Sequence, residues 1–200
     1  MKKFFITLLV LFVACYAKAQ NEVGKCSITP KIGFNVSQIT NADGADARIG
    51  FTAGAEVDYQ VTDMFALTAG ALYSQQGCKV DAGIENATVK LDYINIPILA
   101  NFYIVEGFAL KIGVQPGFLV NDKIKAEADG VSMEIGADQL FGGNSLKDID
   151  FSIPVGASYE FSNVKLDVRY NFGVSPAIKV FGESSMNSVF QLTVGYKFAL

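Results

Sequence analysis

The sequence lacks histidine entirely and contains only three cysteines. Histidine is the usual general base of phospholipase, acyltransferase and protease sites, so its absence argues against those enzymes. Two isolated cysteines, Cys26 and Cys78, remain once the N-terminal segment described below is set aside, and two do not make a disulfide framework. Without histidine they do not make an ordinary zinc site either. We therefore expect no catalytic residue, no cofactor and no metal site.

Long apolar runs are also missing. No stretch of the mature chain reaches the roughly 18 consecutive apolar residues that mark a transmembrane helix. Yet hydrophobic residues make up 50% of the chain and the mean hydropathy is +0.31. These values are high for a soluble exported protein, so the apolar residues must be arranged in another pattern.

The first nineteen residues have the pattern of a secretory signal peptide. Lys2 and Lys3 precede an apolar run over 4–13, which is too short to span a bilayer as a helix. Ala17-Lys18-Ala19 then supplies the small residues of a cleavage site, with Gln20 as the first mature residue. Residues 1–19 are therefore predicted to be removed during export.

An alternative for this segment is lipoprotein processing at Cys15, because residues 12–15 loosely resemble a lipobox.

Cleavage after residue 19 leaves 20–200 as one domain. It removes three lysines and no acid, so the formal charge changes from −4 to −7. This acidic balance argues against nucleic acid as a partner.

The mature sequence consists of segments in which apolar and polar residues alternate, with Gly, Asn, Asp and Ser between them. In the last segment Phe190, Leu192 and Val194 share one face, whereas Gln191 and Thr193 share the other. Most segments run for about ten residues or more, which is the length of a tilted strand that crosses a bilayer. Eight strands are predicted: 27–37, 48–60, 64–76, 90–103, 108–120, 150–161, 164–173 and 188–199.

Alternation alone does not say which face is inside, because a soluble lipocalin-like barrel would turn its apolar face inward. All eleven phenylalanines of the predicted strands lie on the apolar face, and the aromatic residues gather at the strand ends. Pairs such as Phe51 and Tyr59, or Phe108 and Phe118, are therefore separated by roughly 20–25 Å along a membrane normal. An apolar band between two aromatic girdles is typical of a membrane barrel.

The connections alternate in length. Those at one end are short (62–63, 105–107 and 162–163), whereas those at the other run for about 10, 13, 29 and 14 residues. Outer-membrane barrels have short periplasmic turns and long outer loops. The sequence therefore predicts an all-β fold, an eight-stranded antiparallel up-and-down transmembrane β-barrel in the cell outer membrane.

The polar face should then line the interior, which eight strands leave just wide enough for side chains. Glu56 and Asp58 both lie on this face, and a catalytic carboxylate pair is the alternative to ordinary internal ion pairs. We favour ion pairs, because an unpaired buried charge is expensive. The predicted interior polar core is Lys31, Glu56, Asp58, Lys111, Glu160, Lys165, Asp167, Arg169 and Lys197.

The C-terminal residues resemble the terminal strand signal that the barrel assembly machinery reads. Gly195, Tyr196 and Phe198 stand at the positions of that signal, in the order polar, any, Gly, two of any kind, apolar, any, apolar. We expect these three residues to direct assembly, with the barrel assembly machinery and outer-membrane lipid as partners.

The longest predicted loop, 122–149, is acidic and also carries apolar residues. Calcium favours such oxygen ligands, but the spacing matches no calcium loop, and a solvated surface is the simpler interpretation. The segment could fold over the mouth of the barrel or add a short strand. Because loops on a rigid scaffold often carry binding residues, it is the first candidate for a contact surface.

Several segments together resemble the PorT-like family of small outer-membrane β-barrels. They are 31–37, 72–77, 91–99, 113–117 and 169–173, and the likeness covers roughly residues 26–200. The resemblance implies the barrel fold and the outer membrane but no common reaction. One named member of the family is linked to protein secretion, and nothing in this sequence singles out that role.

The functional prediction is a non-enzymatic, monomeric barrel with a structural or interaction role, whose outer loops contact a protein or a surface. The alternatives are a soluble or periplasmic barrel that binds a small hydrophobic ligand, and a narrow channel.

Overall fold

The computed structural model describes residues 22–40, 45–81, 86–128, 131–136, 147–176, 178–180 and 183–200. The predicted signal peptide, including Cys15, lies outside the described residues.

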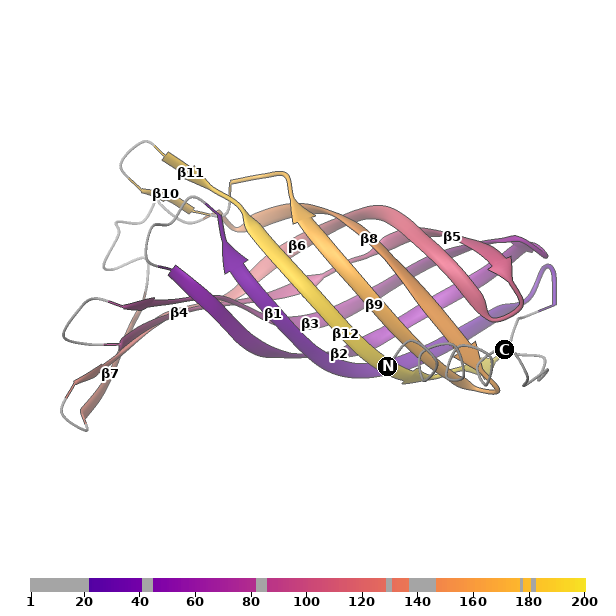
Figure 1. Ribbon diagram of the computed structural model, residues 1–200, viewed down its shortest axis with the longest axis horizontal. Helices are drawn as coiled ribbons and strands as arrows, with labels where there is room; N and C mark the ends of the chain where they lie inside the picture. Colours follow the sequence, from indigo (N-terminus) through magenta and orange to yellow (C-terminus); the bar gives the residue numbers. More distant parts are fainter. Residues whose placement is uncertain are drawn as a thin grey trace, which may run out of the picture.

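The described strands form a closed antiparallel barrel (Figure 1). Its wall has the predicted eight strands, which we call staves because two of them consist of two successive β-strands. The staves are β1 (Cys26–Ile39), β2 (Ala45–Thr62), β3 (Phe65–Asp81), β4 (Asn86–Asn95) with β5 (Ile98–Val105), β6 (Phe108–Ala128), β8 (Ile149–Phe161), β9 (Val164–Gly173), and β12 (Asn187–Tyr196) with β13 (Phe198–Ala199). Each stave pairs with the next along the chain. The last pairs with the first, for example Lys31 with Gly195 and Ser27 with Ala199. The predicted fold class is confirmed.

The fourth stave is interrupted at Ile96 and Pro97, because proline has no N–H to donate to a ladder. The neighbouring strands bridge this break. The backbone N–H of Ile96 donates to the carbonyl of Pro116 at 2.8 Å, and that of Gly70 donates to the carbonyl of Pro97 at 3.1 Å. The barrel wall therefore continues across the interruption.

The apolar face of the strands is on the outside. Nine of the eleven strand phenylalanines are exposed, and the other two, Phe65 and Phe108, are half-buried. Polar side chains fill the inside, as β1 illustrates: Asn35 and Ser37 are fully buried while Ile32 and Phe34 are exposed. Within the described residues no helix is long and apolar enough to cross a membrane.

At one end of the barrel the strands are joined by tight turns of two residues: 63–64, 106–107 and 162–163. Gly107 has φ +77° and Ser162 has φ +52°, so two of these turns use the left-handed region. A Cβ on Gly107 would lie 2.5 Å from the carbonyl oxygen of Glu160, which explains glycine at this position. These are the predicted periplasmic turns.

At the outer end the strands run further than predicted. β6 continues to Ala128, so the predicted loop 122–149 is wrong over 122–128, of which 122–127 pair with 86–91 of β4. The connections before β2 and β4 shrink accordingly to 40–44 and 82–85.

Further strands lie beyond these staves. β7 (Val131–Gly136) pairs with β6, which is the short added strand that was one expectation. β10 (Ile178–Val180) and β11 (Glu183–Ser185) make a separate hairpin.

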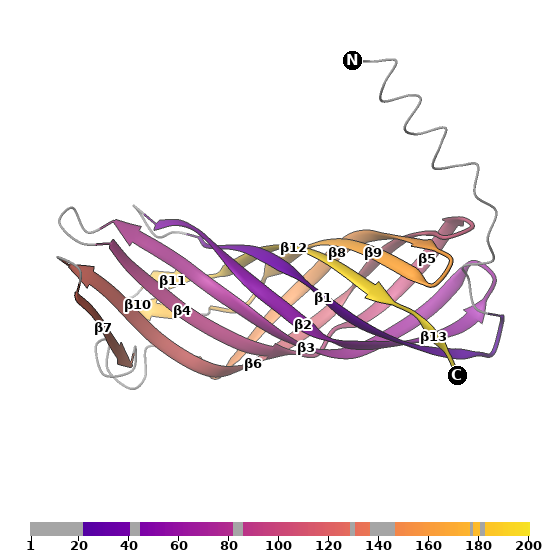
Figure 2. The ribbon, with the colours of Figure 1, turned by 90° about the horizontal axis from the view of Figure 1, so that it is seen from below.

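The extension lies on one side of the barrel. β2, β3, β4, β6 and β7 reach well past the ends of β8, β9 and β12 (Figure 2). We call this part of the sheet, residues 45–48, 75–81, 86–92, 119–128 and 131–136, the outer sheet. It stands above the aromatic girdle formed by Phe51, Tyr73, Phe118 and Phe151, among others.

Candidate functional site: the barrel interior and its outer mouth

The structure brings the nine charged residues of the predicted interior together inside the barrel, each at most 4% exposed. They come from β1, β2, β6, β8, β9 and the junction of β12 with β13. They project inward because successive side chains of a strand alternate between its two faces. Five cations and four carboxylates therefore share one buried layer.

One half of this layer is centred on Asp167. Its carboxylate contacts the Lys111 amine at 2.5 Å, the Arg169 guanidinium at 2.6 Å and the Lys31 amine at 3.5 Å. Glu56 holds the same Lys31 at 2.8 Å and Arg169 at 2.6 Å. Two carboxylates thus bridge three cations, which come from β1, β6 and β9.

The other half is centred on Lys165, which contacts Asp58 at 2.7 Å and Glu160 at 3.1 Å. Glu160 also binds the Lys197 amine at 2.6 Å and accepts a hydrogen bond from the Tyr103 hydroxyl at 3.1 Å. Asp58 further accepts a hydrogen bond from the Thr68 hydroxyl.

Glu56 and Asp58, the alternative catalytic pair, are therefore each bound to a cation. Charged groups buried this deeply are tolerable only when such partners satisfy them. The two carboxylates link β2 to β9, which are separated in the barrel wall by β1 and β12. We call the nine residues the ionic plug, because solvent does not reach this layer.

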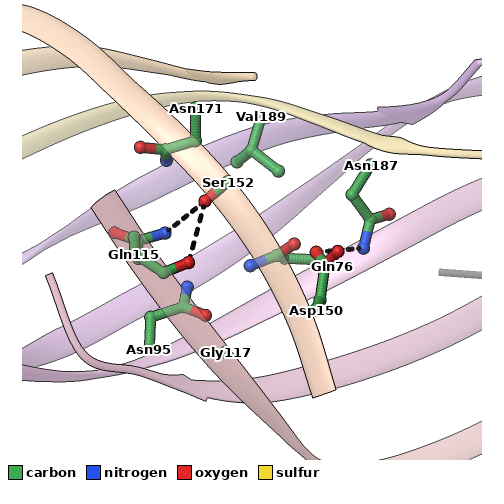
Figure 3. A pocket seen from close by; sticks show the side chains of 9 residues that line it. All are labelled: Gln76, Asn95, Gln115, Gly117, Asp150, Ser152, Asn171, Asn187 and Val189. Atoms are coloured by element: carbon green, nitrogen blue, oxygen red, sulfur yellow. Dashed lines mark hydrogen bonds between the residues drawn. The ribbon is translucent and has the colours of Figure 1, made fainter. Parts of the chain in front are cut away.

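Beyond the plug, toward the outer end, uncharged polar side chains predominate, together with the carboxyl group of Asp150. A small cavity of about 10 Å³ lies there, and its lining is almost wholly polar (Figure 3). Gln115 donates to the Ser152 hydroxyl at 3.3 Å, and Asp150 accepts from the Ser175 hydroxyl at 2.8 Å and the Asn187 amide at 3.2 Å. The lining residues are Gln76, Asn95, Gln115, Gly117, Asp150, Ser152, Asn171, Asn187 and Val189.

Several of these amides have a buried atom with no hydrogen-bond partner, namely Asn95 Nδ2, Gln115 Oε1, Asn171 Oδ1 and Asn187 Oδ1. Leaving such a group unsatisfied costs about 1–3 kcal/mol. A cavity of this size holds about one water molecule, which would supply partners. The arrangement can bind water or a similarly small polar guest. Among the described residues no group of three or more His, Cys, Asp or Glu side chains could hold a metal ion.

This amide layer is not among the site residues predicted from the sequence. Inward parity would have placed Gln115 and Asn171 inside the barrel, but only the register between distant strands brings them to one cavity. The alternation of polar and apolar residues within a strand does not show how that strand is aligned with distant strands.

The inner side of the outer sheet holds a group of apolar side chains next to the buried Arg48 and Gln76. Cys78, Val89, Leu91 and Ile124 are all buried there, and Cys78 and Ile124 both lie opposite Val89 in the ladder. Burial raises the pKa of the Cys78 thiol to about 11, against a smaller lowering by the Arg48 charge. Cys78 and Cys26 are both free thiols.

Comparison with known proteins supports this architecture. The family described as "Outer membrane protein beta-barrel domain" matches residues 18–179. No curated protein matches the sequence.

Among solved structures, Ail, the attachment invasion locus protein of Yersinia pestis, is 17% identical with a TM-score of 0.50, over 88% of this chain and 100% of Ail. OprG of Pseudomonas aeruginosa is 12% identical with a TM-score of 0.50, over 91% of this chain and 99% of OprG. At these identities the likeness is one of fold.

Proposed function

The chain belongs to the outer membrane protein beta-barrel domain family and lies in the outer membrane, and we propose that it works there as a non-enzymatic interaction protein. Its contact surface is the outer end, where the outer sheet projects beyond the membrane. The barrel below serves as a closed anchor. The partner is a protein or a surface outside the cell.

The observation that carries this proposal is the contrast between the two ends of the molecule. The interior is blocked by the ionic plug, whose carboxylates and amines are at most 4% exposed. The outer sheet, by contrast, extends β6 ten residues beyond Phe118, to Ala128, and adds β7 at its edge. A rigid platform above a sealed barrel is suited to contact and not to transport.

The two alternatives fare differently. A soluble barrel that binds a hydrophobic ligand needs an apolar interior, whereas here the apolar side chains face outward. A narrow channel needs a path through the plug. Planar bilayer recordings test this second alternative directly, and large stable conductance steps from the intact protein would replace our proposal with a transport role.

The main experiment removes the outer platform without opening the barrel. Residues 122–147 are replaced by Gly-Asn, which joins Asn121 to Asp148. The join is short because the backbone N–H of Leu119 donates to the carbonyl of Asp148 at 2.8 Å. The trimmed protein should still assemble in the outer membrane and fail to rescue the phenotype of a deletion strain.

A matched control lies at the other end of the barrel. Replacing Glu106 by Asn gives the turn sequence Asn-Gly, keeps a two-residue turn and should preserve rescue. A trimmed protein that assembles and rescues fully would show that the outer platform is not the functional surface.

Three further proposals accompany this one. The five segments named above support a PorT-like relationship within the family. Residues 1–19 are a signal peptide, which intact-mass measurement tests: a mature chain beginning at Gln20 is expected, and a lipid-modified Cys15 would contradict it. Gly195, Tyr196 and Phe198 form the signal that the barrel assembly machinery reads, and the assembled protein is a monomer.

A further inference from the structure

The outward face of the outer sheet is ordered in horizontal rows above the lipid-facing wall. Tyr73, Ile94 and Phe118 lie in register on β3, β4 and β6, at the aromatic girdle. Next outward, Gln75, Asp92 and Asn121 lie in register, and the buried Asp92 accepts hydrogen bonds from the Tyr73 hydroxyl and the Asn121 amide. The surface therefore changes from apolar to polar within one step along the strands.

The next row outward is basic. Lys90 lies directly opposite Lys123 on β6, and its other neighbour in register is Gly77 on β3. Lys123 is in turn opposite Gly136 of β7. Val89 and Ile124, one position along each strand, are buried, so the two lysines point to the opposite, outward face.

Two like charges directly opposite each other on neighbouring strands are unfavourable. Glycines are in register on both sides of the pair. Lys90, Lys123 and Lys125 also interact with other groups of the protein, so the inference rests on position and sign and not on a missing partner. An anion placed between the two amines would offset the repulsion.

The next row outward has an acidic residue in register with each of its lysines. It contains Lys79, Thr88 and Lys125, with Asp46 in register beside Lys79 and Glu134 beside Lys125. These two lysines thus have acids in register, whereas the lower pair has glycines.

The height of the lower pair matches the headgroup region of a bilayer. Lys90 is four residues from Ile94 of the girdle, which is roughly 10 Å along the membrane normal for a strand tilted by about 40°. Lysine side chains are long and can bend back toward the interface while their stems cover apolar surface. Basic residues at this level attract anionic lipid headgroups.

We propose that Lys90 and Lys123 form a binding site for a phosphate group of an anionic glycolipid in the outer leaflet. The pair faces sideways from the barrel wall, at the edge of the lipid, and the lysine ammonium is a common phosphate ligand. Such a site would fix one lipid molecule beside β4 and β6.

The test measures binding of diphosphoryl lipid A to the full mature barrel, folded in a zwitterionic detergent, by native mass spectrometry. Removing a basic residue near a lipid surface weakens binding about fivefold, so K90Q/K123Q should bind roughly 25-fold less tightly. The control K79Q/K125Q removes the same charge from the row that has acids in register and should lose about threefold or less. Both variants must keep the heat-dependent gel shift of a folded barrel.

Two further arms separate the sources of phosphate. Dephosphorylated lipid A should bind weakly and equally to the parent protein and to K90Q/K123Q, and inorganic phosphate should not displace the diphosphoryl lipid at matched concentration. Equal losses in the two double variants would overturn the assignment to this pair. Displacement by inorganic phosphate would overturn the assignment to a lipid.

Discussion

Among the carboxylates of the ionic plug, Asp167 contacts the most cations. Three cations, Lys31, Lys111 and Arg169, lie within 3.5 Å of its carboxylate. In Asp167→Asn, Glu56 still contacts Lys31 and Arg169, but Lys111 loses the carboxylate that it contacts. Removing one partner of a buried ion pair costs about 3–5 kcal/mol, so the unfolding midpoint in urea should fall sharply. Glu106→Gln, at an exposed turn, is the control and should leave the midpoint unchanged.

The two cysteines should react at different rates. Cys78 is 3% exposed and lies five residues beyond Tyr73 of the outer girdle, and burial raises its pKa to about 11. At pH 8 only about one thiol in a thousand would then be the reactive thiolate. Maleimide should label the half-buried Cys26 first, as followed by peptide mass spectrometry. Faster labelling of Cys78, or a bridge between the two in a non-reduced digest, would contradict the structure.

At the scale of elements, the terminal strand should matter for assembly more than for stability. Phe198 in β13 is exposed to lipid and lies 4.8 Å, ring centre to ring centre, from Tyr196. A charge near the interface costs about 1 kcal/mol or less, so Phe198→Asp should barely change the stability of assembled barrels. Surface levels measured by antibody should nevertheless fall. Normal levels would mean that these terminal residues are not read as a signal.

The staves could be predicted from the sequence because lipid imposes a two-residue period and two aromatic boundaries on every strand that crosses it. Above the girdle that constraint ends. Leu91, Asp92 and Tyr93 are all buried in succession, and the register between β4 and β6 shifts at Asp92 and Tyr93. Alternation therefore breaks down where the outer sheet begins, and the sequence predicts loop over much of that sheet, including 77–81 and 122–128. The polar cavity was missed for another reason, since it depends on register between strands far apart in the chain.

For the whole molecule, closure of the barrel predicts resistance to detergent. Every stave has two neighbours in the described ladder, so the barrel wall has no open edge from which SDS could unravel it. An unboiled sample should migrate differently from a boiled one in SDS gel electrophoresis. Identical migration of the two samples would count against a closed barrel.

The seam between β1 and β12 also determines when the protein can fold. Lys31 and Gly195, which are partners across that seam, are 164 positions apart in the sequence. Contacts so distant in sequence are slow to form, because loop closure precedes any gain from pairing. A chain exported from its N-terminus must therefore wait, with β1 unpaired on one side, until its last residues arrive. During that interval the unfolded chain is exposed to proteases and to aggregation. Because of the order of its strands, the chain therefore requires a chaperone in the periplasm.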